Sequence, residues 1–464
     1  MLSNRFVLGK FNVLARLLRY MPRIQTFLAH GILPIALFLV APHVWAQEAC
    51  PDLRPFYPVN ETNWPALSQR LEVILPQCLE SSEFFALYGA AQLNSGNIDE
   101  ASESLELALL LEPDNGAARV DYAQALFLQG QLFSALELNE QLLARADIPA
   151  NLQLGLQNRQ QTWRALTREK SGQIDLLAGY DDNLNGAPGS SLITLTLSGE
   201  PVLLALNPEF RPNSGPYLNF RLAGQYRQLA PEHQHNFLTE VRARASEDTN
   251  SDVLQFDSRY AFIKPGSKQS WQFNTGFSHL LFGGSSLYTA TDARVRYQKA
   301  SSLSCKPYFG LAVQHQLFHN QGHLNAVESK GSAGFNCPLE TSYGRHQIDA
   351  EFSLLSNIAI KSGRPGSDRE GWQVNLNWRF EALGGEVRSQ ISHTQWRDSE
   401  GYSALLDNGA QRWLNRSYVL LQYRKPINRN MTLMVNLYQQ KQQSNLELFR
   451  SDDSTIEIGI SMAL

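Results

Sequence analysis

The chain has 464 residues, of which 18% are charged, and its formal net charge is -4. This length is enough for two domains. The nearly even charge balance argues against a nucleic-acid partner.

The first 46 residues have the features of an export signal. Three arginines precede an apolar run, Gly31 to Val40, and a small-x-small cleavage site ends at Ala46. We expect a signal peptide over residues 1–46. Met21 would give a charged region of more ordinary length than Met1 gives, so both are candidate start sites. The apolar run is too short to cross a bilayer as a helix, and no other long apolar run follows it.

Between Trp64 and about Arg168 the apolar period lies between three and four residues, which indicates helices. Two copies of a tetratricopeptide-like pattern appear, offset by 34 residues. Small residues in such a pattern let paired helices approach closely, glycine supplies the turn, and proline ends a helix. The positions that fit are Tyr88, Gly89, Gly96, Ala101, Ala108, Pro113, Tyr122, Ala123, Gly130 and Ala135. We expect a periplasmic tetratricopeptide-repeat domain over residues 47–170, with capping helices near 64–75 and 152–166. The alternative is a plain pair of helical hairpins.

From Gly172 onward the apolar period becomes two. In Trp372–Phe380 every second side chain is apolar or aromatic and the others are polar, which predicts a strand with one face of each kind. A soluble sandwich would turn the apolar face inward, whereas an outer-membrane barrel turns it to lipid. Aromatic residues at both ends of the apolar row favour the barrel, because they suit the two membrane interfaces.

We expect fourteen barrel strands in residues 171–464. The first covers Gln173–Gly179 and is followed by an insertion with a small hairpin, 192–197 with 202–206. The other strands lie near 216–228, 235–246, 252–264, 268–279, 286–298, 304–317, 327–338, 344–357, 371–382, 384–396, 412–425, 431–441 and 455–464. Short connections alternate with long polar ones, which matches periplasmic turns alternating with external loops. The expected fold is therefore a helical repeat domain followed by a 14-stranded antiparallel outer-membrane β-barrel.

The polar face of these strands carries many charges. The expected lumen residues are Arg221, Arg227, Glu240, Arg242, Arg244, Asp257, Arg259, Asp292, Arg294, Arg296, Arg379 and Glu381. One interpretation is a set of mutually paired charges that hold the strands together. The other is a lining that handles an anionic or unfolded cargo.

Four cysteines follow the signal, an even number in an oxidising compartment. A hairpin centred near Gln321 places Cys305 opposite Cys337, so we expect a cross-strand disulfide. Cys50 and Cys78 flank the first segment of the mature chain, and we expect them to pair as well. The spacings match no zinc site, and no pattern points to a metal or another cofactor.

The stretch GYDDNLNGAP, Gly179 to Pro188, resembles a known family. The stretches ITLTLSGEPVLLAL, RPNSG and, near the end, SNLELFR fit it too. With the helical repeats in front, the chain resembles the surface lipoprotein assembly modulators, the type XI secretion translocons of the outer membrane. The resemblance implies transport of surface lipoproteins or related secreted proteins, with the helical domain recruiting the cargo or a periplasmic chaperone. It brings no catalytic motif. Leu464 departs from the aromatic residue that usually ends such barrels.

Two other functions fit parts of the sequence. Chains with tetratricopeptide repeats and a barrel also export exopolysaccharides, usually with much longer repeat arrays. A barrel lipid hydrolase would need a serine beside a histidine on the lipid face. His279 and His393 have serines next to them in sequence, but neighbours in a strand point to opposite faces. We therefore expect no enzyme activity.

Overall fold

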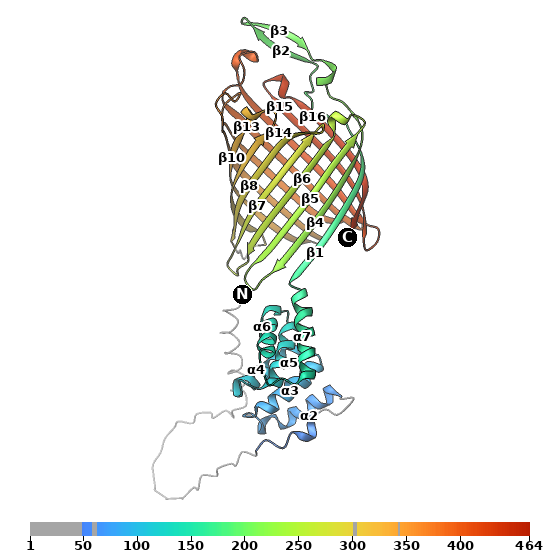
Figure 1. The fold of residues 1–464 in the computed structure, drawn as a ribbon, viewed down its shortest axis with the longest axis vertical. Helices are drawn as coiled ribbons and strands as arrows, with labels where there is room; N and C mark the ends of the chain where they lie inside the picture. Colours follow the sequence, from blue (N-terminus) through green and yellow to red (C-terminus); the bar gives the residue numbers. More distant parts are fainter. Residues whose placement is uncertain (1–48, 58–62, 300–303, 342–343) are drawn as a thin grey trace, which may run out of the picture. The chain divides into compact units, whose positions relative to one another are not determined.

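The computed structural model describes residues 49–57, 63–299, 304–341 and 344–464. They form two units, a helical one ending at Thr167 and a strand-rich one over Arg168–Leu464 (Figure 1). The expected signal peptide and its cleavage site lie outside the described residues. No helix in the described ranges is both long and apolar enough to cross a membrane.

The first unit is a stack of antiparallel helices in which consecutive helices pack together. Side-chain oxygens of Asn63, Ser81 and Asn115 cap the first turns of three of them. Its helices are η2 (Arg54–Phe56), α2 (Trp64–Ile74), η3 (Leu75–Gln77), α3 (Ser82–Asn94), α4 (Ile98–Leu111), α5 (Gly116–Leu128), α6 (Leu132–Leu143) and α7 (Ala150–Ala165).

Small residues at matching positions of α3–α4 and α5–α6 set the close helix spacing. Ala101 and Ala135 are fully buried. A Cβ on Gly89 would lie 2.6 Å from Cγ of Leu105, so α3 and α4 approach as closely as glycine allows. Gly96 and Gly130 have positive φ angles, 86° and 76°, in the turns that end α3 and α5. The two helical hairpins therefore share one local design.

The second unit is a closed, wholly antiparallel barrel of fourteen strands. Strand neighbours in the barrel follow chain order, and β1 closes the ring by pairing with β16. The barrel strands are β1 (Arg168–Asp181), β4 (Gly215–Leu229), β5 (Gln234–Ser246), β6 (Val253–Lys264), β7 (Gln269–Phe282), β8 (Ser285–Lys299), β9 (Lys306–Phe318), β10 (Ala326–Thr341), β11 (Gly344–Ala359), β12 (Arg369–Ala382), β13 (Gly385–Gly401), β14 (Gln411–Pro426), β15 (Met431–Ser444) and β16 (Ser451–Ala463). The expected barrel and strand number are confirmed.

The two ends of the barrel differ. The end where β1 begins and β16 finishes has short turns, including 265–268, 383–384 and 427–430. The other end carries longer loops, with short helical turns η5 (Thr249–Ser251), η6 (Gly322–Leu324), η7 (Asp407–Gly409) and η8 (Glu447–Phe449). Short turns belong to the periplasmic side of outer-membrane barrels, so both ends of the barrel chain lie there.

Several strand ends differ from the sequence prediction. β1 begins at Arg168 rather than Gln173, and β13 continues to Gly401, which shortens the following loop. The connection from β7 to β8 is only Gly283 and Gly284, both with positive φ, although it lies at the long-loop end. Two consecutive residues with positive φ match the tight turn that suits the twist of paired strands. The alternation of short and long connections is thus a tendency and not a strict rule.

The outer face of the barrel is an apolar belt. In β9, Phe309, Leu311 and Val313 are 58%, 71% and 51% exposed, whereas Tyr308, directly before them in sequence, is 1% exposed. The same alternation repeats around the ring, as in β4 and β16. Such a belt is stable only against lipid. The chain is therefore an outer-membrane barrel, and its helical domain is periplasmic.

Two inward tyrosines lie flat across glycines of the neighbouring strand. Tyr217 is opposite Gly179, and Tyr308 is opposite Gly334. A Cβ on either glycine would be 2.6 Å from Cζ of its tyrosine. Gly179, the first residue of the GYDDN stretch, is thus required by close packing of a ring.

The structure contains both expected disulfides. Cys50 and Cys78 join the segment before α2 to the end of η3. Cys305 and Cys337 join the start of β9 to β10 at the periplasmic end of the barrel. In each case the bond ties a chain segment to an element that the backbone hydrogen bonds already hold.

The assignment of the two ends is testable with matched serine-to-cysteine variants. Ser362 lies in the β11–β12 loop and Ser267 in the β6–β7 turn, and both are exposed. In a background without the native cysteines, we expect an impermeant thiol reagent to label Ser362→Cys on intact cells and to leave Ser267→Cys unlabelled until the cells are lysed. The reverse labelling pattern would show that the barrel has the opposite orientation in the membrane.

Candidate functional site

The barrel lumen holds a ladder of ion pairs centred on Arg221. Its guanidinium binds Asp175 at 2.8 Å and Glu240 at 2.8 Å, and Glu240 also pairs with Arg242. Both carboxylates are almost fully buried. Charges so far from water require partners of this kind. The ladder therefore fixes β1, β4 and β5 side by side.

A second group lies across β8 to β11. Lys330 binds Glu351 at 2.7 Å, and Arg296 binds Asp349 at 3.4 Å. The Arg296 guanidinium also lies 3.4 Å from the ring centroid of Tyr308, whose hydroxyl donates to Asp349. This arrangement combines a cation–π contact with an ion pair.

The other expected lumen residues are less strongly held. Arg227 pairs with Glu169 at 3.3 Å where both are well exposed, Asp257 accepts a bond from Gln255, and Arg379 donates to Gln347. In the part of the chain that the structure describes, five of the expected residues have no ion pair within 4 Å. They are Asp257, Arg259, Asp292, Arg294 and Glu381.

Several acids of the lumen were missed by the sequence analysis. Asp175, Asp181 and Asp349 pair with arginines. Glu351 pairs with Lys330, and Glu457 accepts the hydroxyl of Tyr217. All lie in the inward register, which the alternation of their strands would have revealed. In β1 the pattern is blurred, because Leu177 is an apolar residue that also points inward and is buried there.

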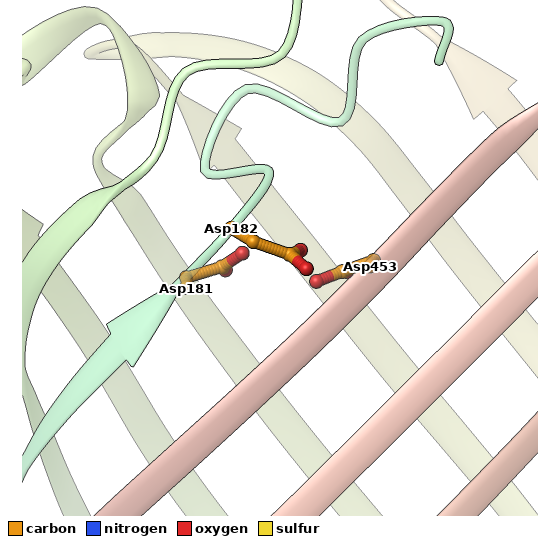
Figure 2. Close-up of side chains that lie close together, drawn as sticks. All are labelled: Asp181, Asp182 and Asp453. Carbon is orange, nitrogen blue, oxygen red and sulfur yellow. The ribbon is translucent and has the colours of Figure 1, made fainter.

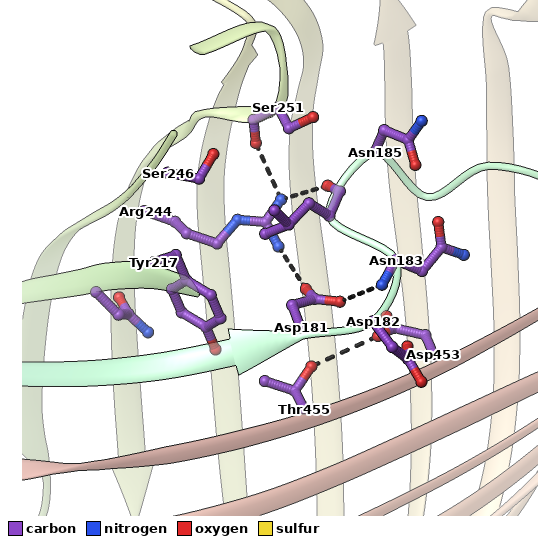
Figure 3. A network of polar contacts seen from close by, with 12 residues as sticks. Asp181, Asp182, Asn183, Asn185, Tyr217, Arg244, Ser246, Ser251, Asp453 and Thr455 are labelled. Atoms are coloured by element: carbon purple, nitrogen blue, oxygen red, sulfur yellow. Dashed lines mark hydrogen bonds and ion pairs between the residues drawn. The ribbon is translucent and has the colours of Figure 1, made fainter. Parts of the chain in front are cut away.

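The GYDDN stretch lies at the outer end of β1, in a network of polar contacts (Figure 3). Asp181 binds Nη1 of Arg244 at 3.0 Å and accepts the backbone N–H of Asn183 at 2.8 Å. Arg244 also donates to the carbonyls of Leu184 and Ser251, so one guanidinium joins β5 to two loops. This residue, expected only as one of the lumen charges, organises the mouth of the barrel.

The rest of the stretch binds β16. Asp182 accepts the backbone N–H of Ser454 at 2.7 Å, and Asn183 donates to the carbonyl of Asp452 at 3.2 Å. Carboxylate oxygens of Asp181, Asp182 and Asp453 lie within 4.8 Å of one another (Figure 2). Oxygen atoms of this kind suit a hard cation such as Ca²⁺. The bonds already made to Asp181 and Asp182 give the cluster a structural role at the seam between β1 and β16.

In the helical unit a buried polar clamp joins α5, α6 and α7. Arg159 donates to the side-chain oxygen of Asn139 and, at 3.0 Å, to the carbonyl of Val120. Asn139 has no exposed surface and also donates to Gln160 at 2.7 Å. Burial raises the pKa of nearby Asp121 to about 6, against the opposing effect of the Arg159 charge.

The histidines that bear on a lipid hydrolase do find hydroxyl partners across strands. Nδ1 of His393 lies 2.9 Å from Oγ of Ser417, on the outer face, and His279 contacts Thr289. The sequence neighbours of these histidines are not their partners, as expected. Among the described residues no carboxylate orients the His393 ring, so the third member of a triad is missing.

Comparison with known proteins identifies no family for this chain. No family model matches the sequence. No curated protein matches it either. An anion-selective porin from Comamonas acidovorans is 11% identical, with 64% of this chain and 99% of the porin covered and a TM-score of 0.32. A bacterial polysaccharide outer membrane secretin is 8% identical, with 63% and 98% covered and a TM-score of 0.34. CdiB from Acinetobacter baumannii is 9% identical, with 63% and 60% covered and a TM-score of 0.32. Likenesses this distant leave the function to be argued from the residues of this chain.

Loss of the Arg244 charge should destabilise the barrel. In Arg244→Met the nearly buried Asp181 carboxylate loses its cation, which costs about 3 kcal/mol. We expect the temperature at which the barrel unfolds in detergent gels to fall clearly below that of the unchanged protein. Arg345→Met is the matched control, because Arg345 and its partner Glu340 are both exposed and such pairs contribute little. Equal effects of the two variants would refute the role of Arg244.

The raised pKa of Asp121 predicts a pH dependence in the helical unit. The folded pKa of about 6 lies above the ordinary value of 3.8, so the folded state binds the proton more tightly than the unfolded state. The free energy of unfolding should therefore decrease as pH rises from about 4 to about 6. We expect Asp121→Asn to remove this part of the dependence, measured by the loss of helical circular dichroism in urea. Glu112→Gln, at an exposed position, should leave it unchanged.

Proposed function

We propose that this protein is an outer-membrane translocon that carries surface lipoproteins or related secreted proteins from the periplasm to the cell surface. The observation that carries the proposal is the joining of two units in one chain. A helical unit with two hairpins of shared design is followed directly by a transport-type barrel. Only two residues separate the end of α7 at Ala165 from the start of β1 at Arg168.

The helical unit has the features of a recruiting module. Its repeated hairpins resemble tetratricopeptide repeats, which bind peptides and proteins on stacked helices. It also exposes large apolar side chains, with Val73, Leu110 and Leu154 at 78%, 77% and 62%. These surfaces support capture of a cargo segment or of a periplasmic chaperone that delivers it.

The barrel has the features of a conduit. Most of its inward acids are neutralised by arginine or lysine, so the lumen charges mainly hold the wall. Arg259 and Arg294 make no ion pair within 4 Å among the described residues, and their charges support contact with a passing polar chain. The covalent tether raises the concentration of captured cargo near the barrel, to roughly millimolar for so short a linker.

Export of an exopolysaccharide is the alternative, since such exporters also combine helical repeats with a barrel. The two-hairpin unit is small compared with the long repeat arrays of those proteins. Surface display of a co-expressed lipoprotein would support the translocon, whereas polymer released into the medium would support the alternative.

Deletion of the helical unit separates recruitment from conduction. The barrel closes its own hydrogen bonds and should fold without the helices. We expect a chain lacking residues 47–167, with the signal kept, to give a heat-modifiable barrel in the outer membrane that displays at least tenfold less cargo on the cell surface. Flow cytometry of a tagged lipoprotein measures the display.

The helical unit supplied as a separate periplasmic protein should restore display only in part, because the tether is lost. If the truncated barrel displays cargo as well as the intact chain does, the helices are not the loading site.

A further inference from the structure

The insertion between β1 and β4 forms a small separate sheet at the outer end of the barrel. Strand β2 (Leu192–Leu197) pairs only with β3 (Glu200–Ala205), and this hairpin is drawn beyond the barrel rim in Figure 1. It is followed by the short turn η4 (Pro208–Phe210). Because β1 pairs directly with β4 along the whole length of β1, the barrel does not need the hairpin to close.

One edge of the hairpin is fixed to the outer loops. The backbone N–H of Thr194 donates to Oε2 of Glu447 at 2.7 Å, in η8. The backbone N–H of Thr196 donates to the carbonyl of Leu405 at 2.8 Å, beside η7. The Thr196 hydroxyl also accepts the N–H of Asn408 at 3.2 Å. Strand β2 is therefore held at its outer edge.

The opposite edge, on β3, is free. The N–H of Leu206 donates to the carbonyl of Ser191, which makes 191 and 206 a hydrogen-bonded pair. Along an antiparallel ladder such pairs recur at every second residue, so Val202 and Leu204 bond to β2. The backbone groups of Leu203 and Ala205 must then point away from β2. No partner for them is found within the described residues.

The side chains of β3 are also uncovered. All six residues of the strand are exposed, and Leu203, Leu204 and Val202 are 70%, 46% and 42% exposed. Proteins usually protect an edge strand with charges, proline or a covering element. Pro201, near the start of β3, lacks an N–H and so removes only one hydrogen-bonding position from the edge. The apolar residues that follow it have no such protection.

We propose that the free edge of β3 binds an extended segment of the exported polypeptide by strand addition. The edge offers alternating N–H and C=O groups, which a polypeptide backbone satisfies and a lipid chain does not. The apolar side chains of Val202, Leu203 and Leu204 then flank alternating apolar residues of the guest. The added strand would continue the interface that β2 and β3 already form, and β2 anchors the resulting three-stranded sheet to the loops.

The natural identity of the guest rests on the proposed function, but the edge itself can be tested without it. The probe is a fluorescent nine-residue peptide of alternating valine and threonine with a lysine at each end. Its partner carries N-methyl groups on every amide between the two lysines, which removes the hydrogen-bond donors along both edges of the peptide and leaves the side chains unchanged. Fluorescence anisotropy with the purified full chain in detergent measures the binding of each.

We expect N-methylation to weaken binding by tenfold or more. Leu203→Pro removes the outward N–H, and because that N–H does not bond to β2 the hairpin should persist. This variant should also weaken binding by tenfold or more. Leu203→Ala keeps the N–H and loses only apolar contact, so it should weaken binding about two- to fivefold. The N-methylated peptide keeps the test decisive if the proline variant misfolds.

Equal binding of the two peptides, or equal effects of the two Leu203 variants, would overturn strand addition and leave only apolar adhesion. Dimerisation of the full chain that Leu203→Pro abolishes would instead assign the edge to a second copy and overturn the proposal. The assay also separates the two proposals from each other. Binding without surface display of cargo would overturn the translocon, whereas display without peptide binding would overturn only the role of β3.

Discussion

The structure depends on closing one ring of backbone hydrogen bonds. Within lipid no water is available to bind a free N–H or C=O, so the first and last strands must pair. The pairing of β1 with β16 is the shorter of the two pairings that β1 makes. Strand β1 pairs with β16 only from Gln173 to Asp181, whereas it pairs with β4 from Arg168 to Asp181. Polar contacts extend the seam at both ends.

At the periplasmic end the backbone N–H of Leu464 donates to the carbonyl of Gly172. At the outer end Asp182 and Asn183 bind the backbone of the first residues of β16. Three separate structural roles therefore account for the residues of the GYDDN stretch. Gly179 accommodates the ring of Tyr217, Asp181 anchors Arg244, and the next two residues continue the seam beyond the last backbone pair.

The fold could be predicted well from the sequence, because contact with lipid selects the side chain at each position of a membrane strand independently of the neighbouring strands. Lipid selects apolar side chains at every second position, as in Trp372–Phe380, and this pattern counts strands without any knowledge of their neighbours. Pairing is a different matter. The register that brings Arg221 between Asp175 and Glu240 depends on the stagger of three strands, which no single strand encodes. For the same reason the cross-strand contact of His393 with Ser417 was not foreseen.

A segment that is not needed to close the barrel or to hold its wall together is a candidate for a functional role, and the β2–β3 hairpin is such a segment. The barrel would close without the hairpin, yet the hairpin carries exposed leucine and valine at a cost in solubility and in the risk of aggregation. The contacts of β2 with the loops that contain η7 and η8 also hold the hairpin in place. The conformational entropy of the hairpin is therefore already lost before a guest binds, and binding does not have to overcome it. An ordered apolar edge at the exit is useful to a barrel that releases extended chains. A barrel that passes only small solutes would gain nothing from it.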